Sequence, residues 1–122
     1  MSADRMDLKD QTKRFASAII RLFVVLPKGR TEVQVVGKQM LRSGTSVAAN
    51  FREASRARSD AEFVSKLDVC TQETDETQLW LELLRDDCGI SSDKLNWLHA
   101  ESDELMAIFV TISKKRKLGD SQ

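Results

Sequence analysis

The feature that most constrains the fold is a long seam with helical spacing in the second half of the chain. From Phe63 to Cys88, core-type residues recur at alternating intervals of four and three: Phe63, Leu67, Cys70, Thr74, Thr77, Leu81, Leu84 and Cys88. This spacing is typical of a helix that packs inside a bundle. Ser59 and Glu62 precede the seam as a capping box, and Gly89 follows it as a C-terminal stop. The pattern predicts one helix over residues 60–88.

The same period recurs in three other segments. Residues 8–26 form a first helix that stops at Pro27. Residues 32–57 form a second, with Thr31 as N-cap and Gln34 completing another capping box, and residues 93–117 form a last one that begins after Ser92. Because the connections are only a few residues long, consecutive helices must run antiparallel. The sequence therefore predicts an all-α, antiparallel up-down-up-down four-helix bundle, formed by a single domain over residues 1–122.

Membrane and export signals are not evident in the sequence. The most apolar run, residues 18–26, is interrupted by Arg21, whereas a membrane span needs about 20 apolar residues. Three aspartates among the first ten residues are unlike a signal peptide. Cys70 and Cys88 lie five helical turns apart, about 27 Å, which is too far for a disulfide within the chain. We therefore expect a cytoplasmic protein with reduced core thiols and no membrane contact.

Catalytic patterns are equally hard to find. His99 is the only histidine, whereas a ferritin-like two-metal bundle needs two Glu-x-x-His motifs. No serine or cysteine nucleophile has a histidine partner in the sequence, and there is no glycine-rich phosphate loop. We expect no catalytic residues, no metal site and no cofactor, and so a protein that is not an enzyme.

Lysine and arginine are concentrated in two places. Lys38, Arg42, Arg52 and Arg56 fall on one line of the second predicted helix, and the last helix ends in Lys114, Lys115, Arg116 and Lys117. The total charge is zero, with 19 Lys and Arg against 19 Asp and Glu, so nucleic acid would have to be bound by a local field. Two interpretations stay open: ordinary solvated surfaces, or a surface that follows phosphates. No aromatic residue is interleaved, so base-specific readout is not predicted.

A second stripe on the third predicted helix points to self-assembly. It lies beside the core seam and contains Val69, Glu73, Glu76, Leu79, Trp80 and Leu83. An apolar patch of this kind usually meets a partner. Residues 1–60 carry a net charge of +6 and residues 61–122 a net charge of −6, so copies of the chain can pack basic side against acidic side. We expect these residues at the interface of a homo-oligomer.

The most distinctive segment of the second helix runs from Arg42 through Asn50 to Glu53. Most residues between positions 43 and 49 are small, which favours close approach of another helix. Asn50 and Glu53 flank the apolar stripe, where they either brace a neighbouring helix or hold a ligand.

This segment resembles the bacterial family of 23S rRNA-intervening sequence proteins. The family motif is carried by Arg42, Ser46, Val47, Asn50 and Glu53, and the resemblance extends over about residues 8–115. A family glycine is replaced here by Ala54. Members are similar to accessory variability proteins of diversity-generating retroelements, which form pentameric barrels and bind nucleic acid and a reverse transcriptase. The resemblance thus implies a pentamer that binds RNA or DNA, or a partner protein. The alternative function is a protein-binding scaffold with no nucleic-acid contact.

Overall fold

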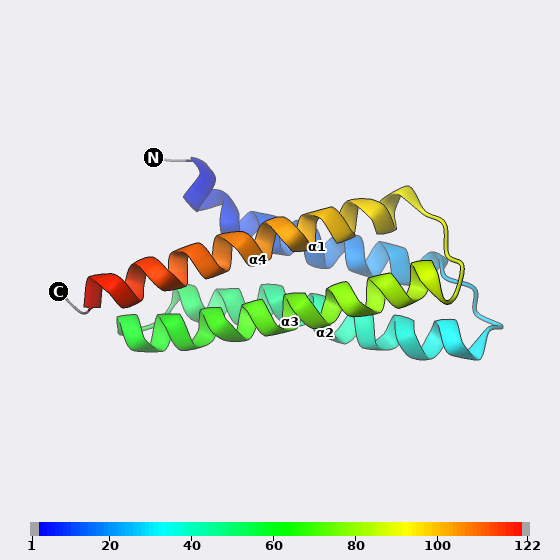
Figure 1. Cartoon of the computed structure of the whole chain (residues 1–122), viewed down its shortest axis with the longest axis horizontal. Coiled ribbons are helices and arrows are strands. Elements are labelled where there is room, and N and C mark those ends of the chain that lie inside the picture. The colour runs from blue at the N-terminus through cyan, green and yellow to red at the C-terminus, as the bar shows by residue number, and fades with distance from the viewer. Residues whose placement is uncertain (1–2, 121–122) are drawn as a thin grey trace.

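The fold is built from four long helices. The computed structural model describes the backbone of residues 3–120 and the side chains of residues 8–119. The helices are α1 (Ala3–Val25), α2 (Thr31–Ser55), α3 (Asp60–Asp86) and α4 (Asp93–Asp120), and the described residues contain no strand. Successive helices lie side by side and run in opposite directions (Figure 1). The all-α, antiparallel four-helix prediction is confirmed, although α1 begins at Ala3, earlier than the apolar period that starts at Leu8.

Two of the predicted helix starts are confirmed by hydrogen bonds. The Ser59 side chain accepts the backbone N–H of Glu62 at 3.0 Å, as an N-cap should. Ser92 likewise accepts the backbone N–H of Leu95 at 3.2 Å. Gly89, just past α3, has a φ of 70°, a conformation that favours glycine.

The predicted cap of α2 is wrong. Thr31 is already the first residue of the helix, the N-cap is Arg30, and no side chain makes a capping bond there. Gln34 reaches back past the N-cap, and its side-chain amide donates to the Pro27 carbonyl at 2.9 Å. The Arg30 guanidinium instead donates to the Cys88 carbonyl at 3.0 Å, which ties the α1–α2 turn to the end of α3.

The core follows the predicted seams. All predicted seam residues of α3 are buried except Phe63, which is half-buried. Both cysteines are free and buried. Burial raises the pKa of the Cys70 thiol from its ordinary value of 9.0 to about 12. These thiols behave as small apolar core residues.

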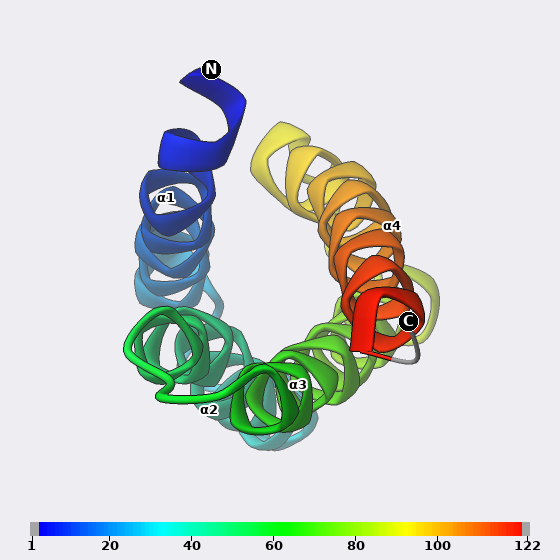
Figure 2. The same cartoon turned by 90° about the vertical axis from the view of Figure 1, so that its left-hand side faces the viewer.

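The helices form an open arc. Neighbours in sequence pack along their lengths, whereas α1 and α4 contact each other only sparsely. Viewed from the end, the arc opens between α1 and α4 (Figure 2). None of the helices within the described residues is long and apolar enough to cross a membrane. The two outer helices of the arc therefore leave part of their facing surfaces uncovered by each other.

Candidate nucleic-acid interface and the groove between α1 and α4

Two groups of cations that are distant in sequence meet at one end of the bundle. The end of α2, the start of α3 and the end of α4 lie together there (Figure 1), and Arg58 and Arg116 line one shallow depression with Phe63. Residues 52–68 and 114–117, which we call the basic end, contain eight Lys and Arg and four Asp and Glu. A local net charge of +4 therefore arises in a chain whose total charge is zero.

The carboxylates of the basic end are already engaged within the chain. Three form ion pairs: Asp60 with Arg116 (2.7 Å), Asp68 with Lys117 (3.8 Å) and Glu53 with Lys66 (2.6 Å). The fourth, Glu62, accepts the backbone N–H of Arg58 at 3.1 Å. Five exposed cations have no acidic partner among the described residues: Arg52, Arg56, Arg58, Lys114 and Lys115. These five side chains can approach an external anion without first breaking an ion pair.

The other two cations of the predicted stripe lie elsewhere. Arg42 faces α3, where its Nη2 donates to Glu76 Oε1 at 2.9 Å and its Nη1 lies 3.7 Å from Glu73 Oε1. Lys38 is exposed but precedes Arg52 by fourteen residues, about 21 Å along the helix. The end of α2 that carries Arg52 and Arg56 thus lies at the same end of the bundle as the end of α4 that carries residues 114–117, about 15 Å along α2 from Arg42 and about 21 Å from Lys38.

The motif residues of α2 connect this helix to α3 and to itself. Arg42 pairs with α3 as described, and Glu53 pairs with Lys66 of α3, which raises the pKa of that lysine. The Asn50 amide donates to the Ser46 carbonyl at 2.9 Å within α2. For Arg42 and Glu53, the observed contacts are those of side chains that brace a neighbouring helix.

The predicted assembly stripe of α3 divides into inward and outward residues. Glu73 and Glu76 face Arg42 of α2, and the half-buried Trp80 packs against the chain's own core. The indole Nε1 of Trp80 is buried with no hydrogen-bond partner among the described residues. Val69 and Leu83 are half-buried, so Leu79, with 47% of its surface exposed, is the stripe's most accessible apolar residue.

One aromatic side chain does lie among the cations, which sequence spacing did not reveal. The Arg116 guanidinium sits 4.2 Å from the centre of the Phe63 ring, a cation–π contact between α4 and α3. The two residues are 53 positions apart, so only the antiparallel packing of the two helices brings them together.

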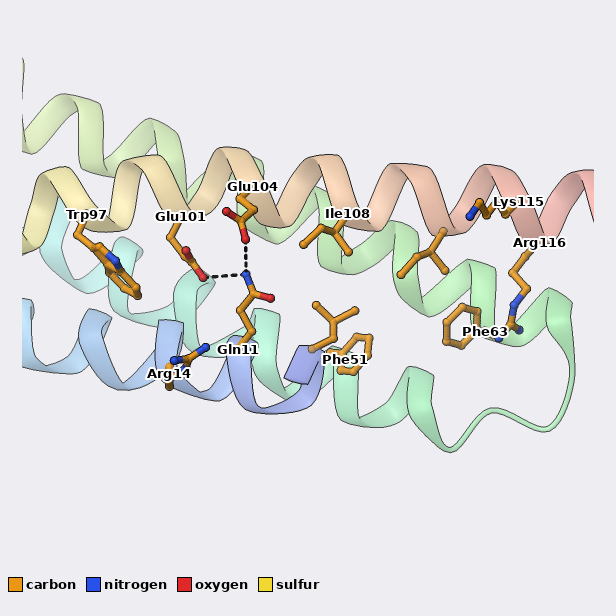
Figure 3. Close-up of a pocket in the computed structure, with 12 residues that line it drawn as sticks. Gln11, Arg14, Phe51, Phe63, Trp97, Glu101, Glu104, Ile108, Lys115 and Arg116 are labelled. Carbon is orange, nitrogen blue, oxygen red and sulfur yellow. Dashed lines mark hydrogen bonds between the residues drawn. The ribbon is translucent and has the colours of Figure 1, made fainter. Parts of the chain in front are cut away.

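A groove of about 1060 Å³ runs between α1 and α4. Its apolar lining consists of Leu8, Phe51, Phe63, Trp97, Ile108 and Ile112. Near its middle, the amide of Gln11 donates to Glu101 Oε2 at 2.9 Å and to Glu104 Oε2 at 3.1 Å (Figure 3). Trp97 and Arg14 lie toward one end, and Lys115 and Arg116 lie at the other (Figure 3). The prediction of the core missed this groove, although residues 97, 101, 104, 108, 112 and 115 follow a helical period of their own.

The residue types that most often bind metals or act as nucleophiles, histidine and cysteine, make contacts within the bundle. They hold no group of three or more His, Cys, Asp or Glu side chains that could bind a metal ion. His99 Nε2 lies 2.8 Å from Glu82 Oε2, in a pair that joins α4 to α3. The raised pKa of Cys70 keeps its thiol protonated near neutral pH, and a thiol is a poor nucleophile.

The comparisons with known proteins concern nearly the whole chain. Residues 4–111 match the sequence model of the 23S rRNA-intervening sequence protein family. The chain is also similar to a protein of unknown function from the S23 ribosomal protein family of Bacteroides thetaiotaomicron, solved by crystallography. The two are 38% identical, with 87% of this chain and 97% of the other covered and a TM-score of 0.76. Curated proteins gave no match.

Proposed function

The chain belongs to the 23S rRNA-intervening sequence protein family, and from this premise we propose that it is a non-enzymatic, self-assembling bundle that binds the phosphate backbone of RNA through its basic end. The family name connects its members with insertions in 23S rRNA, and for this reason we propose RNA as the nucleic acid that is bound. The proposal depends on one observation above all: five exposed cations gather at the basic end after its carboxylates have been engaged.

The chemistry of these five cations suits phosphate. Arg52, Arg56 and Arg58 offer planar guanidinium groups, which bind phosphate oxygens in pairs, and Lys114 and Lys115 add point charges. Binding of this kind releases counterions, so it weakens steeply as salt is added. It is also tolerant of sequence, because phosphates carry no base information.

A titration of labelled RNA at two salt concentrations tests the proposal. The variant Arg52→Gln/Arg56→Gln should lower the log–log salt slope by about two per engaged subunit on a duplex. The matched control is Lys38→Gln/Arg42→Gln, which removes two cations of the same helix that lie away from the basic end. An equal decrease of the salt slope in both variants would show that RNA binding depends on the total charge and not on the basic end. Absence of binding at low salt would leave the scaffold function in place of RNA binding.

Self-assembly would repeat the basic end around a ring and so strengthen binding without new contacts. We propose a homo-oligomer, a pentamer as the family resemblance implies, in which the α3 face around Leu79 meets the basic side of a neighbour. Leu79→Asp should shift the mass measured by light scattering toward one chain while the helix content stays constant. Leu79 is a better probe than Trp80, because Trp80 also packs against the core. A wild-type mass of one chain at micromolar concentration would refute assembly.

The second candidate function is a protein-binding scaffold without nucleic-acid contact. The groove between α1 and α4 favours it, because a long apolar surface of that shape suits a polypeptide. The two surfaces overlap at Lys115 and Arg116, but Arg52 and Arg56 lie outside the groove and Ile108 lies outside the basic end, so substitutions at Arg52, Arg56 and Ile108 distinguish the two functions.

A further inference from the structure

We propose that the groove between α1 and α4 binds an amphipathic helix of a partner protein, and that this helix carries acidic side chains at the end beside Lys115. The groove adjoins the phosphate surface proposed above and shares Phe63, Lys115 and Arg116 with the basic end, whereas the rest of its lining lies outside that end. The proposal rests on the length, lining and charge of the groove.

The length and shape of the groove fit a helix. On α4 its lining runs from Trp97 to Lys115, eighteen residues or about 27 Å. The lining residues recur at intervals of four and three, so α4 presents a second seam beside its core seam. A volume of about 1060 Å³ lies at the upper end of the range for small-molecule sites, and it is drawn out along the helix. Another helix can pack along such a seam as helices pack in bundles.

The lining supplies apolar anchors. Ile108, Ile112 and Phe63 are half-buried, so each still has surface to bury against a partner. Trp97 is 46% exposed at one end of the groove, and tryptophan is a residue type that often dominates binding energy. Apolar residues of a partner helix at positions i, i+3, i+4 and i+7 would meet this row.

Cations lie at both ends of the groove, Arg14 toward Trp97 and the pair Lys115 and Arg116 at the other end, so the denser positive charge is at the Lys115 end. Lys115 makes no ion pair with any described residue, and Arg116 lies beside it. A carboxylate of the partner helix placed there would gain a cationic neighbour. Glu101 and Glu104 lie in the middle of the groove, where they would repel the phosphates of RNA. The groove as a whole therefore favours a protein segment over a nucleic acid.

A second copy of this chain fits less well. On α1 it exposes Ile20, Val24 and Val25, but Arg21 lies among them and Lys28 follows, and these cations would meet the cations of the groove. The acidic helix α3 exposes one large apolar side chain among its described residues, Leu79, and cannot fill a groove five helical turns long. Each helix of this chain exposes at most three large apolar side chains among the described residues, so a partner with a longer apolar stripe fits the groove better than a second copy.

Opening the groove requires little rearrangement. Among the described residues, the polar bonds between α1 and α4 are those of the Gln11 amide to Glu101 and Glu104. They are partly exposed, so water can replace them at small cost. A partner helix can therefore widen the groove without breaking the core.

The test uses a synthetic eighteen-residue helical peptide with leucines at helical spacing and three glutamates at one end. A second peptide has lysines in place of the glutamates, and a third has its leucines shuffled out of register. Binding is measured by anisotropy of the labelled peptide. It is also followed by the fluorescence of Trp97 in a Trp80→Phe chain, where Trp97 is the sole tryptophan.

The acidic peptide should bind, and the lysine peptide should bind about five- to tenfold more weakly, with the difference shrinking as salt is added. Ile108→Glu should weaken binding by at least about tenfold. Val110→Glu, an exposed position on α4 outside the groove, should change it less than twofold. Equal binding of the shuffled peptide, equal effects of the two substitutions, or no binding would each overturn the proposal. Two further outcomes would overturn it. One is that single-stranded RNA changes the Trp97 fluorescence and that Ile108→Glu abolishes this change. The other is that the peptide changes the fluorescence only by changing the oligomeric mass of the protein.

Discussion

Replacing Gly44 by alanine is expected to destabilise the bundle, against the preference of an isolated helix. Alanine favours a helix interior over glycine by about 1 kcal/mol. A Cβ atom at position 44, however, would lie 2.7 Å from Ile19 Cγ1 and 3.0 Å from both its Cδ1 and its Cγ2. Ile19 is fully buried, and its β-branched side chain has few alternative rotamers. The helices α1 and α2 would have to separate.

Overpacking of this kind costs about 1–3 kcal/mol, and three contacts of 3.0 Å or less place Gly44 in the upper half of that range. After the gain in helix propensity, the expected loss is about 1–2 kcal/mol in the free energy of unfolding. Urea titration followed by circular dichroism measures it. Gly119→Ala is the control, because a Cβ there meets nothing within 4 Å, and it should change stability by less than about 0.5 kcal/mol.

A double-mutant cycle identifies the cause. In an Ile19→Ala background the clash is absent, so Gly44→Ala should become neutral or stabilising by up to about 1 kcal/mol. If Gly44→Ala stabilises the unaltered chain, or if its effect is the same in both backgrounds, the close approach of α1 to α2 is not what selects glycine.

Three further outcomes are expected. Ser59→Ala should lower the free energy of unfolding by about 1 kcal/mol, whereas Thr31→Ala should have almost no capping effect, as urea titration will show. Arg42→Gln should cost less than about 1 kcal/mol, because both it and Glu76 are about half exposed, and it should leave the salt slope of RNA binding unchanged. The raised pKa of Cys70 means that the folded chain holds this proton more tightly than the unfolded chain. The stability that this proton contributes is therefore complete below about pH 9 and is lost as the pH rises toward about 12. Over that range, a Cys70→Ala chain should lose less stability than the unaltered chain in unfolding titrations.

The fold was predictable because its signals are local and repeated. Heptad spacing identifies the face of α3 that is buried, and Ser59 and Ser92 mark helix starts with bonds that form within a few residues. The prediction that Thr31 is the N-cap of α2 was wrong for a related reason. Thr31 and Gln34 have the residue types and the spacing of a capping box, but the turn after Pro27 places Arg30 at the N-cap. A capping motif does not contain the geometry of the turn before it.

The candidate sites depended on packing between distant residues. Helical periodicity put Arg42 and Arg52 on one line, yet only the position of α3 shows that Arg42 is engaged by Glu76. The pairing of Phe63 with Arg116 and the groove between α1 and α4 arise from the spacing of helices that are remote in sequence. The second seam of α4 was a visible signal for the groove, but spacing alone does not tell which seam faces the core.

Lysine labelling with and without RNA tests the central claim most directly. A limiting amount of an amine-reactive acetylating reagent, followed by mass spectrometry, reports the relative accessibility of each lysine. RNA bound to the basic end should protect Lys114 and Lys115 while Lys28 and Lys38, which are exposed elsewhere on the bundle, continue to react at an unchanged rate. Protection of Lys38 without Lys114 and Lys115, or no protection under conditions where RNA is bound, would contradict the assignment of the basic end as the phosphate-binding surface.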